Sequence, residues 1–135
     1  MQKSIINGKS LRLKRALHLL RKPGTASVYE VLRVIDSIPL FADEHTDRLL
    51  ASSRLTGFPA PDPAEVRQAI DKVISINNMT KGNIRSDWLK GRHGMKLLTY
   101  AVPHSYPSEA QYREGVSTVM VELERENPKA KLWQE

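Results

Sequence analysis

The chain of 135 residues contains no cysteine, and only 6% of its residues are aromatic. Without cysteine it has no disulfide framework, no thiolate nucleophile and no cysteine zinc site, and this composition fits a reducing compartment. No apolar run approaches the roughly 18 residues that a membrane helix needs, and the charged N-terminus does not resemble a signal peptide. We therefore expect a cytoplasmic protein with no membrane partner.

Patterns that mark catalytic or metal sites are also missing. No serine stands in a nucleophile context, no pair of carboxylates is placed by a recognisable spacing, and the four histidines are scattered. His45 stands among Asp43, Glu44 and Asp47, but acidic residues are common at a helix N-terminus and no second histidine lies at helical spacing. We expect no catalytic residue, no metal and no cofactor, and hence a protein that is not an enzyme.

Length and composition suit one domain, 1–135, because 40% of the residues are hydrophobic and a chain of this size buries about two-thirds of its unfolded surface. The periodicities predict a mainly α fold, a compact bundle of five to six helices with at most one short β-hairpin. A proline-rich crossover at 57–63 divides this bundle, and a charged tail at 128–135 follows its last helix.

The strongest local pattern follows the crossover. Asp62 is suited to cap a helix that begins at Pro63, and apolar residues then recur every three or four positions up to Asn77. Thr80 is suited to cap a second helix, which glycine ends about ten residues later. This outline fits two ordinary packed helices of a bundle and also a helix-turn-helix-like pair at 63–90.

The N-terminal residues admit two interpretations. Asn7-Gly8 is typical of a two-residue hairpin turn, which would join strands at 4–6 and 9–13. Alternatively, a helix covers 11–21, with a narrow stripe of leucine and alanine and basic residues over the rest of its surface. We favour the helix, because apolar and basic residues separate onto two sides of it more completely than we would expect for a strand of that length.

Four further elements follow from capping and periodicity. A serine and a glutamate three residues apart form a capping box in front of an aliphatic run, which predicts a central core helix over 27–38. Helices are also expected over 43–54 and 108–127, and a short strand over 97–102. Phe58 is expected to pack across the crossover.

Charge suggests the partner. Residues 1–33 carry eight basic residues and one acidic residue, and residues 72–107 carry six basic residues and one acidic residue. If these basic blocks share one face, that face suits a polyanion. Our leading hypothesis is a non-enzymatic nucleic-acid-binding or regulatory protein, with duplex DNA as the favoured nucleic acid.

The hypothesis assigns candidate site residues by chemistry. Asparagine, serine and lysine can bond base edges, and arginine and lysine hold phosphates. The candidates near bases are Asn83, Ser86 and Lys90, and those for phosphates are Arg12, Lys14, Arg15, Lys81, Arg85, Arg92 and Lys96.

The rival hypothesis is a helical protein-protein interaction module, such as an adaptor, inhibitor or chaperone. It would bind an acidic protein through the basic helix at 11–21, or an apolar groove through the tail, where Leu132 and Trp133 are two large apolar residues among charges. These two residues either dock on the parent domain or anchor a partner, and a homodimer is a further option.

Overall fold

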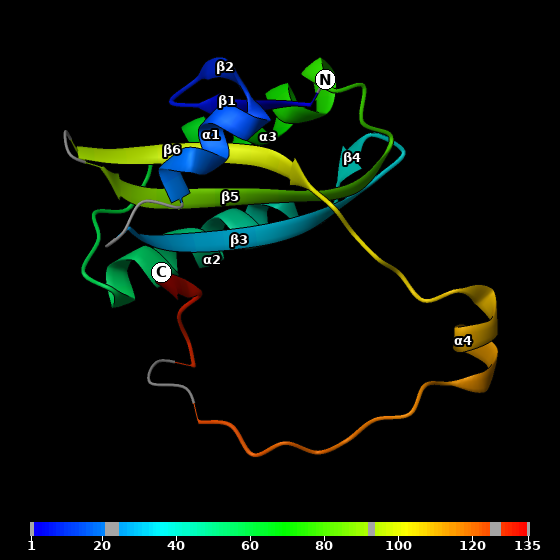
Figure 1. Ribbon diagram of the computed structural model, residues 1–135. Coiled ribbons are helices and arrows are strands. Elements are labelled where there is room, and N and C mark those ends of the chain that lie inside the picture. Colours follow the sequence, from blue (N-terminus) through cyan, green and yellow to red (C-terminus); the bar gives the residue numbers. More distant parts are fainter. Residues whose placement is uncertain (1, 21–24, 92–93, 125–127, 135) are drawn as a thin grey trace.

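The computed structural model describes residues 2–20, 25–91, 94–124 and 128–134, and it is built around an antiparallel sheet (Figure 1). The strand order is β2-β1-β6-β5-β3-β4, and β7 pairs with β3 outside this path. The strands are β1 (Lys3–Ile6), β2 (Lys9–Arg12), β3 (Ala26–Ile35), β4 (Ile38–Pro39), β5 (Lys81–Gly91), β6 (Gly94–Val102) and β7 (Leu132–Gln134). The helices are α1 (Leu13–Leu20), α2 (Ala42–Leu55), α3 (Pro63–Ile76) and α4 (Glu109–Glu114). The predicted bundle of five to six helices is therefore wrong, and the fold is mixed α/β.

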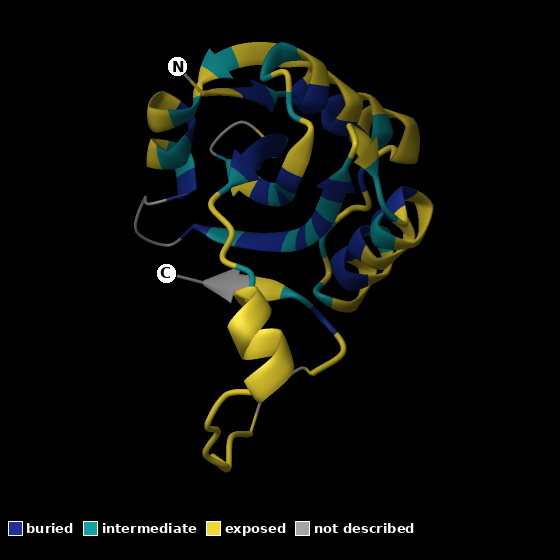
Figure 2. Ribbon diagram, turned by 90° about the vertical axis from the view of Figure 1, so that its right-hand side faces the viewer, coloured by how far each residue is buried: buried dark blue, intermediate teal, exposed yellow. Residues whose placement is uncertain are grey.

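Helices pack on both faces of the curled sheet (Figure 1). On one face, α2 and α3 bury Leu49, Ile70 and Val73 against the strand residues Leu32 and Ile84. On the opposite face, α1 buries its short leucine stripe against β5 and β6 in a second, smaller cluster. The buried residues follow the sheet and the inner sides of these helices, as Figure 2 shows. Among the described residues, no helix is long and apolar enough to cross a membrane.

The central core helix expected over 27–38 is instead the long strand β3. Its aliphatic residues lie on both faces of the sheet, because alternate residues point to opposite sides. Leu32 and Val34 are buried toward α2 and α3, whereas Val31 and Ile35 are half-buried on the other face. An aliphatic run with apolar residues on both faces also shows the three- and four-residue spacings of a helix, and its β-branched residues favour the strand.

The second helix of the predicted helix-turn-helix is also a strand. β5 pairs with β3 on one side and with β6 on the other, so it lies inside the sheet and cannot enter a DNA groove. The expectation rested on Ile84 and Trp88 falling on one side of a helix. A spacing of four residues also places two side chains on one face of a strand, so it does not distinguish the two structures.

Three elements are confirmed. Helices occupy the expected 43–54 and 63–76 regions as α2 and α3, and the expected strand over 97–102 lies within β6. Asp62 caps α3, since its carboxylate accepts a hydrogen bond from the Ala64 amide. Phe58 packs against the main core as expected, and the Trp88 indole donates to the Pro59 carbonyl oxygen at 2.6 Å.

Both interpretations of the N-terminal residues are partly right. Asn7 and Gly8 have positive φ angles and join β1 to β2 in a hairpin, and the helix α1 begins directly after β2. Of the helix expected over 108–127, only α4 is confirmed, with Gly115 at φ 78° as its C-cap, and residues 125–127 lie outside the described part of the chain. Residues 116–124 are exposed and belong to neither helix nor strand, and this segment lies away from the sheet (Figures 1 and 2).

Candidate active site

A buried carboxylate marks the most unusual position on the sheet. Glu30 lies in the middle of β3 on the face that packs against α2, and its side chain is 5% exposed. Burying a charge is costly unless it is paired and hydrogen-bonded. The chain meets this requirement with groups from two other elements, α2 and the C-terminal tail.

The helix α2 supplies an arginine and a histidine. Arg48 donates from Nε to Glu30 Oε1 at 2.7 Å and from Nη2 to Glu30 Oε2 at 2.6 Å. His45 Nδ1 lies 2.9 Å from the same Oε2. The two residues reach one carboxylate because positions three apart share a helix face. The paired carboxylate of Glu30 raises the pKa of the Arg48 guanidinium above its ordinary value.

The tail supplies a lysine. The antiparallel pairing of β7 with β3 and a 3.0 Å hydrogen bond from the Tyr29 amide to the Lys131 carbonyl oxygen hold the tail on the sheet. The Lys131 amide also faces Ser52 Oγ of α2 at 3.5 Å. These contacts place Lys131 Nζ 3.7 Å from Glu30 Oε2 and 5.8 Å from the centre of the Tyr29 ring.

The resulting cluster, which we call the Glu30 cluster (Glu30, His45, Arg48 and Lys131), carries more positive than negative charge. One carboxylate faces a guanidinium and an amine, with a histidine as a third partner. Glu30 is covered, but the side chains of Arg48 and Lys131 are 49% and 33% exposed. A partly open site with surplus positive charge and N–H donors suits an anion such as a phosphate.

A second buried carboxylate supports the opposite face of the sheet. Asp87 is fully buried and accepts hydrogen bonds from Ser27 Oγ, the Arg85 guanidinium and the Tyr100 hydroxyl. The Arg85 guanidinium lies over the Tyr29 ring, with its carbon 4.2 Å from the ring centre. Burial, together with the Asp87 carboxylate, raises the pKa of the Tyr100 hydroxyl far above its ordinary value. This network fixes the strand positions next to Tyr29, and Tyr29 in turn borders Lys131.

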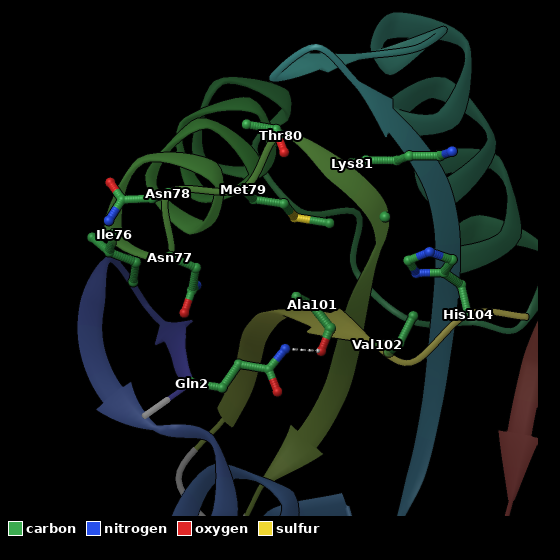
Figure 3. A pocket seen from close by; sticks show the side chains of 11 residues that line it. Gln2, Ile76, Asn77, Asn78, Met79, Thr80, Lys81, Ala101, Val102 and His104 are labelled. Atoms are coloured by element: carbon green, nitrogen blue, oxygen red, sulfur yellow. Dashed lines mark hydrogen bonds between the residues drawn. The ribbon is translucent and has the colours of Figure 1, made fainter.

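A separate hollow of about 550 Å³ opens between the end of α3, the start of β5 and the end of β6 (Figure 3). Its lining is mostly polar and includes Asn77, Lys81 and His104. Gln2 closes one side, and its amide donates to the Ala101 carbonyl oxygen. Lys81, a predicted phosphate contact, lies on this hollow, away from the Glu30 cluster.

The other candidate site residues on β5 make contacts inside the protein. Arg85 is ion-paired with Asp87, Ser86 Oγ lies 3.1 Å from Thr99 Oγ1 in the core, and the Asn83 side chain accepts a hydrogen bond from the Tyr106 hydroxyl. Central strand positions and these internal bonds exclude Asn83 and Ser86 as readers of a major groove.

The remaining candidates are spread over the molecule. Lys90 is exposed and Lys96 half-buried near the paired ends of β5 and β6, and Arg92 lies outside the described residues. Arg12, Lys14 and Arg15 line a hollow of about 590 Å³ beside α1, with His18. These three residues of the first basic block and Lys81 of the second therefore line different hollows. Leu132 is 37% exposed on β7, so its role as a partner contact stays a prediction, as does that of Trp133.

Sequence reasoning missed the Glu30 cluster, although signals for two members were present. Glu30 was interpreted as the second half of a capping box, and His45 was set aside as part of an acidic helix start. A glutamate inside a run of strand-forming aliphatics is itself a signal, because a charge in such a position requires a partner. Within the described residues, no group of three histidine, aspartate or glutamate side chains is placed to hold a metal ion.

These features define an α/β protein in which a lysine and an arginine converge on one buried carboxylate. Comparison with known proteins gives the same fold among the aminotransferases. The chain aligns with the branched-chain amino acid aminotransferase of Escherichia coli with a TM-score of 0.66 and 24% identity, over 80% of this chain and 42% of that one. A hypothetical aminotransferase from Mycobacterium tuberculosis, in a form bound to α-ketoglutarate and PMP, aligns with a TM-score of 0.66 and 23% identity, over 85% and 44%.

The model of the family described as amino-transferase class IV matches residues 27–134, and the chain belongs to this family. The D-alanine aminotransferase of Listeria monocytogenes is 29% identical over 83 residues, which are 61% of this chain and 28% of that protein. The chain thus spans less than half the length of these relatives. The family match covers β3, α2 and the tail, and so contains the whole Glu30 cluster.

Family membership corrects the functional expectations drawn from the sequence. An aminotransferase family contradicts the prediction of a non-enzymatic nucleic-acid-binding or regulatory protein, and also the alternative of a helical interaction module. Neither duplex DNA nor an acidic protein is supported as the partner. The error has a physical origin, because net charge reports on solubility and association but not on fold, and here the basic residues are spread over several surfaces.

Proposed function

We propose that this chain forms part of the active site of an aminotransferase that uses pyridoxal 5'-phosphate, in which Lys131 would hold the aldehyde end of the cofactor and Arg48 its phosphate. The observation that carries the proposal is the convergence of Lys131 and Arg48 on Glu30 within the matched region. Structures of the hypothetical aminotransferase from M. tuberculosis are described as bound to PLP in one form and to PMP in another. The proposal departs from the expectation that the chain uses no cofactor.

The residues present fit this cofactor. Enzymes of this chemistry need an amine that bonds to the cofactor and donors that hold its phosphate. Among the lysines that the structure describes, Lys96 and Lys131 are half-buried and the others are exposed. Lys131 is the one that shares a carboxylate with an arginine, so its amine lies close to a group that can hold the phosphate. Arg48 brings a permanent charge and a planar set of donors that match phosphate.

The roles of the chain's own groups follow from their positions. When bound, the cofactor supplies an electron sink for the carbon that gives up the amino group. Arg48 binds and orients the phosphate, while Lys131 Nζ is the group placed to take up and return a proton. Glu30 balances part of the positive charge, and Tyr29 covers one side of the amine. In the proposed reaction an amino acid donates the amino group and a 2-oxo acid accepts it. The cysteine-free sequence supports the cytoplasm as the location of the protein.

Reductive trapping tests the proposal. The chain is incubated with pyridoxal 5'-phosphate; the amine attacks the aldehyde carbon, water leaves, and borohydride reduces the new C=N bond to a stable amine that mass spectrometry locates. We expect the label on Lys131, with much less label when pyridoxal without the phosphate is used. Lys131→Arg should abolish this label, and Lys129→Arg, a matched change two residues away at an exposed position, should leave it intact. Equal labelling of all exposed lysines would contradict the assignment.

A further inference from the structure

The Glu30 carboxylate binds the Arg48 guanidinium side-on. Oε1 accepts from Nε and Oε2 accepts from Nη2, so one edge of the guanidinium is fully used. Arginine has five N–H donors in a rigid plane. Once one edge is bound, the direction of Nη1 is fixed, and no described residue hydrogen-bonds to Nη1. The carboxylate therefore determines which edge of Arg48 is presented to a ligand.

The same carboxylate also orients the lysine. Oε2 lies 2.6 Å from Arg48 Nη2, 2.9 Å from His45 Nδ1 and 3.7 Å from Lys131 Nζ. Glu30 is the rigid member of the group, because it is buried on β3, a strand that pairs with β5 and with β7. Arg48 and Lys131 are long, partly exposed side chains from two separate elements. Without a common anchor, each would sample many rotamers independently.

We propose that Glu30 is a positioning residue, which fixes the Arg48 guanidinium and the Lys131 amine relative to each other so that a phosphorylated aldehyde meets both at once. The inference rests on the proposed function and deepens it. Two groups held in a fixed arrangement turn a two-point encounter into a single event, whereas small misplacements cost large factors in rate.

The charge of Glu30 and its role in orienting the two cations have opposite effects on ligand binding, so an experiment can distinguish them. The carboxylate lowers the positive charge of the cluster, so it weakens the attraction for any anion. Its removal by Glu30→Gln should therefore leave binding of inorganic phosphate equal to that of the wild type or tighter. The same substitution should slow the capture of pyridoxal 5'-phosphate by Lys131, because the amide cannot hold two cations in register. A purely structural role would weaken both, and a purely electrostatic role would strengthen both.

The experiment measures two quantities for each variant. Phosphate affinity comes from titration with inorganic phosphate by calorimetry, and the rate of Lys131 labelling comes from borohydride quenching at successive times, with mass spectrometry as the readout. For Glu30→Gln we expect a labelling rate lower by about 10- to 100-fold, with phosphate affinity retained. Glu30→Asp keeps the charge but withdraws the carboxylate by one methylene, so its labelling rate should lie between that of the wild type and that of Glu30→Gln. The charge-matched control, Glu114→Gln on the exposed helix α4, should match the wild type in both quantities.

A second variant keeps the test decisive if Glu30→Gln does not fold, as judged by circular dichroism. Arg48→Lys keeps the charge but lacks the planar edge that Glu30 grips, so it should also slow labelling. When both variants fold, the double variant should be labelled no more slowly than the slower of the two single variants, because both substitutions remove the same contact between Glu30 and Arg48. Labelling of either single variant at the wild-type rate, or multiplied effects in the double variant, would overturn the role of Glu30. Failure of the wild type to label at Lys131 would instead overturn the proposed function, and this inference with it.

Discussion

Replacing Asp87 should destabilise the protein more than almost any other single substitution. Its side chain is fully buried and accepts four hydrogen bonds: two from Arg85, one from Ser27 and one from Tyr100. Asp87→Ala removes both carboxylate oxygens, and with them the acceptors of two hydrogen bonds from the Arg85 guanidinium, whose side chain is 20% exposed. Removing one member of a buried pair costs about 3 to 5 kcal/mol. The slight exposure of Arg85 lets water compensate in part, so we expect a value near the lower end, about 3 kcal/mol.

A double-mutant cycle with Arg85→Ala isolates the pair from the rest of the network. If the ion pair carries the effect, the double variant should be more stable than the sum of the two single losses implies, by about 1 to 3 kcal/mol. Urea unfolding followed by circular dichroism and by Trp88 fluorescence measures each free energy of unfolding. Asp71→Ala on the exposed side of α3 is the control and should stay within about 0.5 kcal/mol of the wild type. A loss below about 1 kcal/mol for Asp87→Ala, or strict additivity, would refute the reasoning.

Three smaller perturbations test other parts of the fold. Because folding raises the pKa of Tyr100, the neutral hydroxyl stabilises the protein below the ordinary tyrosine pKa of about 10, and this stabilisation is lost as the pH rises further. Tyr100→Phe should lower the free energy of unfolding by about 1.5 to 3 kcal/mol at neutral pH and should reduce the decline of stability above about pH 10, as measured by urea unfolding. A decline of stability above about pH 10 as steep as in the wild type would contradict this prediction. Asp62→Ala removes the cap of α3 and should cost about 1 kcal/mol by urea unfolding, a figure that a neutral result would contradict. Gly82→Ala should lower the melting temperature by an equivalent of about 1 to 3 kcal/mol, because φ is +147°, a conformation that residues with a Cβ rarely adopt, whereas the end of the Met79 side chain next to the new Cβ can move aside. An unchanged melting temperature would show that the backbone relaxes freely.

Local signals in the sequence predicted those elements whose ends are chemically marked. Asp62 and Pro63 marked the start of α3, and Asn7-Gly8 marked the first hairpin. The strands β3 and β5 were misassigned because their pairing partners lie far away in the chain: Ser27 of β3 pairs with Leu89 of β5, 62 positions later. A pattern read within a dozen residues contains no information about such partners, and an aliphatic run with apolar residues on both sheet faces also satisfies helical spacing.

The candidate site was hidden by the same misassignment. As part of a helix start, Glu30 would have been exposed and its charge unremarkable. On the inner face of a strand, the same carboxylate must be compensated, and here the compensation comes from cations on other elements. Arg48 and Lys131 stand 18 and 101 positions further along the chain, so neither spacing nor composition could connect them to Glu30.

The strand assignment of β3 and the location of the site are therefore one problem. If residue 30 lies on the buried face of a sheet, then α2 has to present Arg48 toward it, and a tail that pairs with the same strand brings Lys131 to the same oxygen atom. In the proposed function, a lysine and an arginine held together in this way bind a phosphorylated carbonyl compound at two points, which neither residue could do alone. The chemistry proposed for this chain thus depends on which side chains of β3 face α2. A shift of its register by one residue would turn Glu30 to the other face of the sheet, away from Arg48 and Lys131.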